Sequence, residues 1–363
     1  MQPITVPVDL ADRGYQIHIG QQLFAQCGSL IANGLPKFGR RTTILTDSNV
    51  GPLYAETVAT SLRQAGFSPD IVTVPAGELS KSMTCVEDVC RQMMRLGHDR
   101  GSSLIALGGG VVGDLGGFVA AIFFRGIAYV QLPTTIVSQV DSSVGGKTGV
   151  NAPEGKNLIG AFHQPQMVIA DIDALQSLPD REYNEGFAEV IKHAAIRDAN
   201  LLDTVAALEG RQANQLAPMI QRNVEIKARV VVEDERETSG VRALLNFGHT
   251  IGHAIESTAG YGKLLHGEAI SLGLAAALDL GVRKFGLAQA DADRVIAALE
   301  KFNLPLKLEH DISDEIILEA LARDKKFEAG NIRFVIVEKL GEAFVTDEVT
   351  IDDIKLALAN LRA

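Results

Sequence analysis

The chain has 363 residues, 46% hydrophobic and 22% charged, a composition typical of a soluble globular protein with one large or two medium domains. Its formal net charge of −11 argues against a nucleic-acid partner, because phosphate backbones are bound by basic surfaces. No signal peptide is visible, and Asp114 and Arg125 interrupt the most apolar zone before the ~20 apolar residues that a membrane span needs. Three cysteines show no metal-binding spacing, so we expect a cytoplasmic protein with no membrane partner.

The first half alternates apolar runs with amphipathic stretches. Strands are expected at 41–47, 67–78, 103–110, 127–135 and 166–172. Helices are expected at 54–66 and 86–97, which end at Gly66 and Gly97, and at 111–124. This alternation predicts an α/β domain, with a parallel sheet covered by helices.

The pattern changes near residue 178, where Ser177 to Asp180 has the spacing of a helix capping box and Pro179 stands near the first helical position. Beyond it, helical periodicity dominates at 185–198, 217–235, 267–286 and 290–302, with a short pair of strands within 331–349. We therefore expect an α/β domain over 1–178 and a mainly helical domain over 179–363, with an active site in the cleft between them.

Gly108 to Gly110 follow a strand and open a helix, so the backbone N–H groups of this turn could receive a pyrophosphate. No acidic residue stands ~20 positions later to hold a ribose, but Asp47, at the end of an earlier strand, could do so. The alternative is a glycine turn required only for packing. Residues 144–148 resemble a P-loop without its first glycine, and the turn-like 149–157 follows, which argues against a nucleotide triphosphatase.

Chemistry-bearing residues concentrate in the second half. Glu189, Lys192 and His193 share one face of an expected helix. Asn246, His249 and His253 recur at i, i+3 and i+7 as a polar stripe, and His266 stands at the entrance of an apolar helix. One Glu and two or three His could form a three-ligand zinc site with an open position, although the spacing does not settle which His binds.

Basic residues cluster around these motifs in an otherwise acidic chain, which favours a multiply charged anionic substrate. They are Lys147, Lys156, Lys192, Lys227, Arg242, Lys325 and Lys326. For Lys227, Lys325 and Lys326 the alternative is a solvated helix face.

The motifs PAGELSK, LGGGVVGDLGGFVA, PTTIVSQVDSSVGGKTGVN, EGKNLIGAFHQP, SLPDREYNEGFAEVIKHA, LLNFGHTIGHAIE and LHGEAISLG resemble, in this order, those of the 3-dehydroquinate synthase family. The resemblance runs from about Asp47 to Lys326. It implies a lyase that converts 3-deoxy-D-arabino-heptulosonate 7-phosphate to 3-dehydroquinate and phosphate in the shikimate pathway, with NAD and Zn²⁺ as cofactors and Co²⁺ as an alternative metal.

The resemblance also implies roles for individual residues. The metal would be held by Glu189, His249 and His266. NAD would be held by Asp47, Glu78, Lys81, Gly110, Val111, Val112, Gly113, Asp114, Thr134, Thr135, Lys147, Lys156, Ala174, Leu175, Gln176 and Ser177. Substrate contacts would come from Asp141, Lys147, Asn157, Lys192, Lys227, Arg242, Asn246, His253 and one of Lys325 or Lys326. Arg125 would reach the site of a neighbouring subunit, which implies a homodimer.

Three other functions compete with this interpretation. A metal-dependent polyol or alcohol dehydrogenase would share the two-domain plan and the glycine turn, but it would accumulate NADH. A related cyclase that makes an inosose or a valiolone would act on a substrate without the carboxylate that Lys227, Arg242 and Asn246 suit. A binding protein without activity would be expected to have lost one of the three metal ligands.

Overall fold

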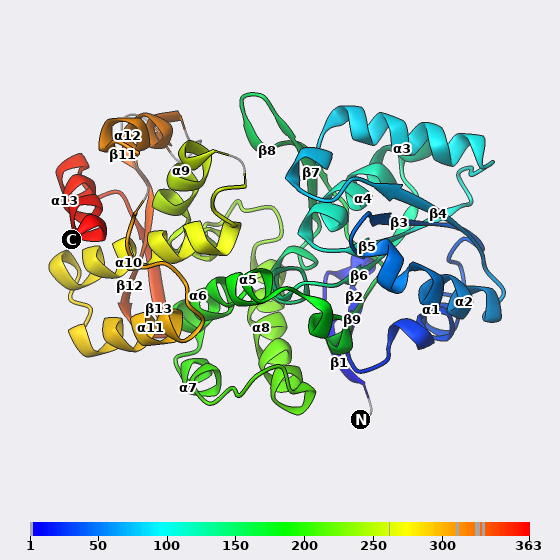
Figure 1. Ribbon diagram of the computed structural model, residues 1–363, viewed down its shortest axis with the longest axis horizontal. Coiled ribbons are helices and arrows are strands. Elements are labelled where there is room, and N and C mark those ends of the chain that lie inside the picture. The colour runs from blue at the N-terminus through cyan, green and yellow to red at the C-terminus, as the bar shows by residue number, and fades with distance from the viewer. Residues whose placement is uncertain (1–2, 261, 310–311, 324–326, 329–330) are drawn as a thin grey trace. The chain divides into compact units, whose positions relative to one another are not determined.

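One seven-stranded sheet forms in the first part of the chain, and its central strands, such as β5 (Ser103–Gly108) and β9 (Met167–Asp171), are buried on both faces (Figure 1). The computed structural model describes residues 3–260, 262–309, 312–323, 327–328 and 331–363. The sheet consists of β1 (Ile4–Val8), β2 (Tyr15–Gly20), β3 (Arg41–Asp47), β4 (Ser68–Val74), β5 (Ser103–Gly108), β6 (Ala128–Pro133) and β9 (Met167–Asp171). Their order is β1-β2-β9-β6-β5-β3-β4, and every pair except β1–β2 is parallel.

Helices cover both faces of this sheet, as continuous apolar strands require. On one face, α1 (Cys27–Gly34) and α2 (Glu56–Gln64) share a core with Ile105 and Leu107 of β5. On the other face, α3 (Met83–Arg95) and α4 (Gly110–Ile122) share a core with Leu104 and Ala106 of the same strand.

The strand order reverses between β3 and β5. Chain order proceeds from β3 to β4 on one side of β3 and then continues from β5 on its other side. β3 and β5 are parallel and in register, so Asp47 and the glycine turn leave the sheet at the same edge. In α/β proteins, ligands bind outside the carboxyl ends of strands at such a reversal.

The second part of the chain is mainly helical. Its helices are α5 (Asp180–Glu185), α6 (Phe187–Arg197), α7 (Asn200–Ala206), α9 (His249–Ala259), α10 (His266–Lys284), α11 (Gln289–Lys301), α12 (Asp314–Arg323) and α13 (Ile351–Arg362). Two short antiparallel pairs join them, β10 (Phe327–Glu328) with β11 (Asn331–Ile332) and β12 (Phe334–Lys339) with β13 (Glu342–Thr346). An α/β first part with a parallel sheet and a mainly helical second part are therefore confirmed.

The chain divides into two compact units, one of residues 1–178 with 211–232 and the other of residues 179–210 with 233–363. The sequence assigned the whole of 179–363 to the second domain. The difference is helix α8 (Ala213–Glu233), most of which belongs to the first unit. Contacts within that unit account for this, because Lys227 of α8 forms an ion pair with Asp141 and Arg211 donates to the carbonyl of Leu175.

Two local expectations were wrong, and a third was incomplete. Helix α5 has Pro179 as its N-cap, and Ser177 bonds the carbonyl of Ala174, so the capping box does not form. The segment 149–157 does contain a turn, at Pro153 and Glu154, but the residues on either side of it form a hairpin of β7 (Lys147–Ala152) and β8 (Gly155–Phe162). The polar stripe is broken, because Gly248 is left-handed (φ 77°) and separates the 3₁₀ helix η8 (Arg242–Asn246) from α9.

Candidate active site

Glycines let helices α9 and α10 approach closely, and this packing places two histidines at the starts of these helices. A Cβ on Gly273 of α10 would lie 1.9 Å from the carbonyl oxygen of Gly248, and one on Gly252 would lie 2.9 Å from that of Ala269. Side chains larger than hydrogen are therefore excluded at both positions. His249 is the first residue of α9 and His266 the first of α10.

Glu189 of α6 lies between these histidines in the core of the second unit. Its Oε1 is 3.3 Å from Nε2 of His249 and 3.1 Å from Nε2 of His266. Two ligands of a tetrahedral zinc ion, each ~2.0–2.2 Å from the metal, are separated by about 3.4 Å. The three side chains are thus spaced as ligands of one ion, with their donor atoms all within 4.8 Å of one another.

The other ring nitrogen of each histidine is already engaged. Nδ1 of His249 lies 3.0 Å from the carbonyl oxygen of Phe247, which can only accept, so this nitrogen carries the proton. Nδ1 of His266 lies 3.4 Å from Oε2 of Glu256. Such contacts fix the ring orientation of metal-binding histidines and leave the Nε2 lone pair for the ion. The donor set therefore fits a zinc-type ion.

Lys192 pairs with the second oxygen of Glu189 and is fully buried. Burial alone would raise the pKa of Glu189, but Lys192 and the two histidines hold that pKa well below its usual range. Burial, with a smaller contribution from Lys192, lowers the pKa of His249, which keeps this ring neutral and able to bind a cation.

His266 behaves in the opposite way. Burial would lower its pKa, but its hydrogen bonds to Glu189 and Glu256 outweigh that effect and raise the pKa to about 10. In the metal-free protein this imidazole therefore holds a proton at neutral pH, in the position that a metal ion would take.

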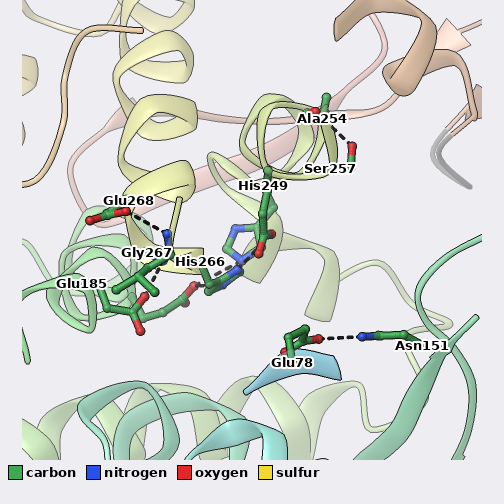
Figure 2. A network of polar contacts seen from close by, with 12 residues as sticks. Glu78, Asn151, Glu185, His249, Ala254, Ser257, His266, Gly267 and Glu268 are labelled. Atoms are coloured by element: carbon green, nitrogen blue, oxygen red, sulfur yellow. Dashed lines mark hydrogen bonds and ion pairs between the residues drawn. The ribbon is translucent and has the colours of Figure 1, made fainter. Parts of the chain in front are cut away.

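Carboxylates also fix the start of α10 (Figure 2). Glu185 accepts from the backbone N–H of Gly267 (2.6 Å), and Glu268 accepts from that of Leu265 (2.8 Å). Arg181 in turn binds Glu268 through two hydrogen bonds of 2.6 and 2.7 Å. The backbone that carries His266 is therefore held on both sides.

The other site residues expected in the second unit lie close to the candidate metal position or on η8, which contacts α6. The ring of His253 is 5.0 Å from that of His249 and 5.9 Å from that of His266, centroid to centroid. Arg242 is buried, and its guanidinium donates to the carbonyl of Glu235. Asn246 donates to Glu237 over 3.4 Å. Lys325 and Lys326 lie outside the described residues.

In the first unit, several expected NAD residues form one polar network. Lys81, which is buried, bonds Asp114 of α4 (2.7 Å) and lies 3.9 Å from Glu78 of the 3₁₀ helix η4 (Glu78–Ser80). Burial raises the pKa of Asp114, and Lys81 opposes that rise.

The glycine turn has little free space. A Cβ on Gly108 would lie 2.7 Å from Val112, and one on Gly113 would lie 2.7 Å from Oε1 of Gln131. Thr134 follows β6 and donates its N–H to the carbonyl of Gly108. Its hydroxyl is buried and has no partner among the described residues. Backbone N–H groups at the start of α4 and this unpaired hydroxyl fit the phosphates and hydroxyls of a dinucleotide.

The other residues expected near NAD or substrate are spread over the first unit. Asp47 accepts from the N–H groups of Asn49 and Val50 (2.8 and 2.9 Å). Ala174, Leu175, Gln176 and Ser177 lie in the 3₁₀ helix η7 (Ile172–Ser177). Asp141, in η6 (Ser138–Ser142), is 2.6 Å from Lys227. Lys147 begins β7, and Lys156 and Asn157 lie on β8. Arg125 is exposed and ends the 3₁₀ helix η5 (Phe123–Arg125).

Sequence reasoning missed Glu256, Asp234 and Asn151, which hold expected site residues in place. Glu256 follows His253 by three residues on α9 and has the same helical spacing as the stripe, so its position could have been found. Asp234 accepts from the N–H of Arg242 (3.1 Å) and Asn151 from that of Asn157 (2.9 Å). These two contacts depend on backbone geometry, at the end of α8 and in the β7–β8 hairpin, that no sequence spacing indicates.

The chain matches two family models, 3-dehydroquinate synthase N-terminal over residues 71–185 and 3-dehydroquinate synthase C-terminal over residues 186–327. It is also 45% identical to the 3-dehydroquinate synthase of Symbiobacterium thermophilum over 98% of this chain and 100% of that protein. The chain belongs to the 3-dehydroquinate synthase family. Membership of this family makes it an enzyme and confirms the resemblance seen in its motifs.

Solved structures of other proteins have the same fold as this chain. The 2-epi-5-epi-valiolone synthase of Streptomyces hygroscopicus, solved with NAD⁺ and Zn²⁺, superposes with a TM-score of 0.87 at 28% identity over 96% of each chain. 2-Deoxy-scyllo-inosose synthase, solved with carbaglucose-6-phosphate, NAD⁺ and Co²⁺, gives 0.88 at 27% identity over 98% of this chain and 99% of that chain. A butanol dehydrogenase from Thermotoga maritima shares the fold alone (0.68, 13% identity, 96% of each chain).

Proposed function

We propose that this enzyme converts 3-deoxy-D-arabino-heptulosonate 7-phosphate to 3-dehydroquinate and phosphate, with NAD and one divalent metal ion, Zn²⁺ or Co²⁺, as cofactors. The observation that carries the proposal is the convergence of Glu189, His249 and His266 with both Nε2 atoms directed at one carboxylate oxygen. Family membership and the NAD-bound relatives support the rest.

The two cofactors divide the chemistry. When bound, NAD would take up and return a hydride, and the metal would lower the pKa of the ring hydroxyl that is oxidised. Oxidation of that hydroxyl to a ketone makes the adjacent C–H acidic, so phosphate leaves by β-elimination. Return of the hydride, ring opening and an intramolecular aldol closure complete the reaction without net redox change.

The chain's own residues would bind and orient the substrate. Lys147, Asn157, Lys192 and His253 would hold the phosphate. Arg242 and Lys227 would hold the carboxylate, since the planar fork of an arginine matches both carboxylate oxygens. Arg242 is buried and already fixed through its backbone and guanidinium, which suits a preorganised charge contact.

Phosphate release measured from the heptulosonate phosphate, with absorbance at 340 nm recorded in parallel, tests this function. We expect release without accumulation of NADH, its loss on chelation, and its recovery when Zn²⁺ or Co²⁺ is added back. His249→Ala should not recover. Accumulated NADH without phosphate would instead show a dehydrogenase, and full release in the presence of chelator would contradict the metal assignment.

The second part of the proposal is a homodimer in which Arg125 of one copy contacts the site of the other. Apolar side chains are exposed near this residue. They are Ile122 at the end of α4, Phe124 in η5, and Leu158, Ile159 and Phe162 on β8, which contacts α4. Phe124 and Arg125 both have positive φ (47° and 71°), a costly conformation for bulky residues. Phe124→Asp should yield monomers in sedimentation, and an unchanged dimer would contradict this surface.

We also propose a cytoplasmic location. The three cysteines form no disulfide, as expected in a reducing compartment. Among the described residues, no helix has the length and apolar character of a membrane span.

A further inference from the structure

The β7–β8 hairpin contains an irregularity at one residue. Val150 pairs with Ile159 and Ala152 with Gly155, so Asn151 alone faces three residues of β8, Lys156, Asn157 and Leu158. Extra residues of this kind kink a strand and redirect its side chains, and they are common beside active sites. Two of the three redirected residues are ones that we expect to bind NAD and substrate.

Asn151 closes this irregular segment with its own side chain. Its Oδ1 accepts from the backbone N–H of Asn157 (2.9 Å). Asn157 has a φ of 56°, in the left-handed region that asparagine tolerates better than most residues. The amide oxygen of Asn151 therefore helps to hold the backbone of Asn157 in this left-handed conformation.

The opposite side of the same amide reaches the expected NAD residues. Nδ2 of Asn151 donates to Oε1 of Glu78 (2.8 Å), a contact drawn in Figure 2, and its backbone N–H donates to the carbonyl of Lys81 (2.9 Å). Lys81 continues the chain of contacts to Asp114 at the glycine turn (2.7 Å). One side chain thus connects the bulge of β8 to the network that would hold the cofactor.

We infer that Asn151 is a positioning residue that transmits NAD binding at Glu78 and Lys81 to the hairpin segment carrying Lys156 and Asn157. The inference rests on the proposed function, since it assumes that NAD occupies this network. A dinucleotide that orders Glu78 would fix the carboxylate to which Asn151 donates. The side chain of Asn151 would then be fixed, and its amide oxygen would in turn fix the N–H of Asn157. Phosphate would then bind to a hairpin that has already lost its conformational freedom, so the two ligands would bind cooperatively.

Hydrogen exchange of the intact protein, followed by mass spectrometry with and without NAD, tests the inference. Peptides covering 147–162 report the hairpin, and peptides covering 108–114 report the glycine turn as an internal reference. In the unmodified chain, NAD should slow exchange in both. In Asn151→Leu, NAD should still slow the turn but no longer the hairpin. A hairpin response that persists in this variant would overturn the inference.

A second variant separates coupling from simple loosening. Asn151→Asp keeps an acceptor for the N–H of Asn157 but cannot donate to Glu78. We expect near-normal hairpin exchange without NAD and a lost response to NAD. Asn360→Ala, which removes another Asn-to-carboxylate contact (Asn360 to Asp279, 3.0 Å), should behave like the unmodified chain. A hairpin that is equally unprotected in both Asn151 variants, yet responds to NAD, would show a purely structural role.

Calorimetry supplies an independent readout. The Kd of NAD is measured with and without inorganic phosphate. Phosphate should lower this Kd at least about 5-fold in the unmodified chain and should leave it unchanged in Asn151→Leu. Equal improvement in both proteins would overturn the inference. Failure of NAD to bind the unmodified chain, or to protect its glycine turn, would instead overturn the proposed function as well.

Discussion

Glu256 contacts the ring nitrogen of His266 that faces away from Glu189, with Oε2 3.4 Å from Nδ1. The carboxylate and the candidate metal position therefore lie on opposite sides of one imidazole. In this arrangement the carboxylate raises the basicity of the ring and fixes which nitrogen is free to bind the ion.

Glu256→Gln tests that relationship. The amide keeps the size of the side chain but loses the charge, so we expect the Kd for Zn²⁺ to rise by about 10–100-fold. Competition with a chromophoric chelator measures it. Glu300→Gln, an exposed change on α11, is the matched control. Zinc affinity equal to that of the control would remove Glu256 from the support of the metal site.

Glu189→Gln should abolish stoichiometric metal binding and nearly all turnover. It would also break the buried ion pair of Glu189 with Lys192, which costs about 3–5 kcal/mol of unfolding free energy in the metal-free protein. The double variant Glu189→Gln with Lys192→Met removes both charges and should recover most of this stability without recovering the metal. Denaturant unfolding and metal analysis on both variants separate the two effects, and full metal content in either contradicts the assignment.

Metal affinity should rise with pH because of His266. The pKa of this ring is raised to about 10 in the metal-free fold, so Zn²⁺ must displace its proton throughout the neutral range. The apparent Kd should fall about tenfold per pH unit between pH ~6.5 and ~9. The stability that the charged ring gives to the metal-free protein is complete below the unfolded pKa of ~6.5 and is lost as pH rises through the folded value. Chelator-buffered zinc titrations with a flat profile would exclude this proton.

Arg242→Ala should lower kcat/KM by an amount equivalent to roughly 2–4 kcal/mol, because the arginine is buried and would contact the substrate carboxylate. Inorganic phosphate, which has no carboxylate, should bind this variant normally. Unchanged kinetics would show that Arg242 has another role.

Asp234→Asn should raise KM by about 10-fold if one charge-assisted hydrogen bond of ~1.4 kcal/mol is lost. The value of kcat should change little. Burial would raise the pKa of Asp234, but hydrogen bonds from the backbone N–H groups of Arg242, Ser239 and Thr238 hold this pKa well below its usual range. Its contribution to stability is therefore present above ~pH 4 and lost as pH falls. Unfolding in the variant should depend less on pH below ~4, and an unchanged acid profile would contradict this.

The sequence predicted the parts of the fold that repeat a local pattern. The strands around Ile44 and Ile105 and the helix of Glu189 follow from periodicity, and the position of His266 follows from the apolar helix behind it. The break at Gly248 did not follow, because the packing of Gly273 against it requires a residue far along the chain. The hairpin at Asn151 has glycine and proline where strands usually have branched residues, so its pairing with 155–162 was hidden.

Helix α8 has a consequence for how the chain is made. The first unit includes Arg211–Val232, so a nascent chain that has reached Leu178 still lacks part of that unit. A further 54 residues must be added before Lys227 and its neighbours are available, which takes roughly 3–10 s at bacterial-like rates of ~5–20 residues per second. During that interval Asp141 has no lysine partner from α8. Fragments that stop at Leu178 should therefore be poor folders, and any division of the gene into two halves would need to respect this helix.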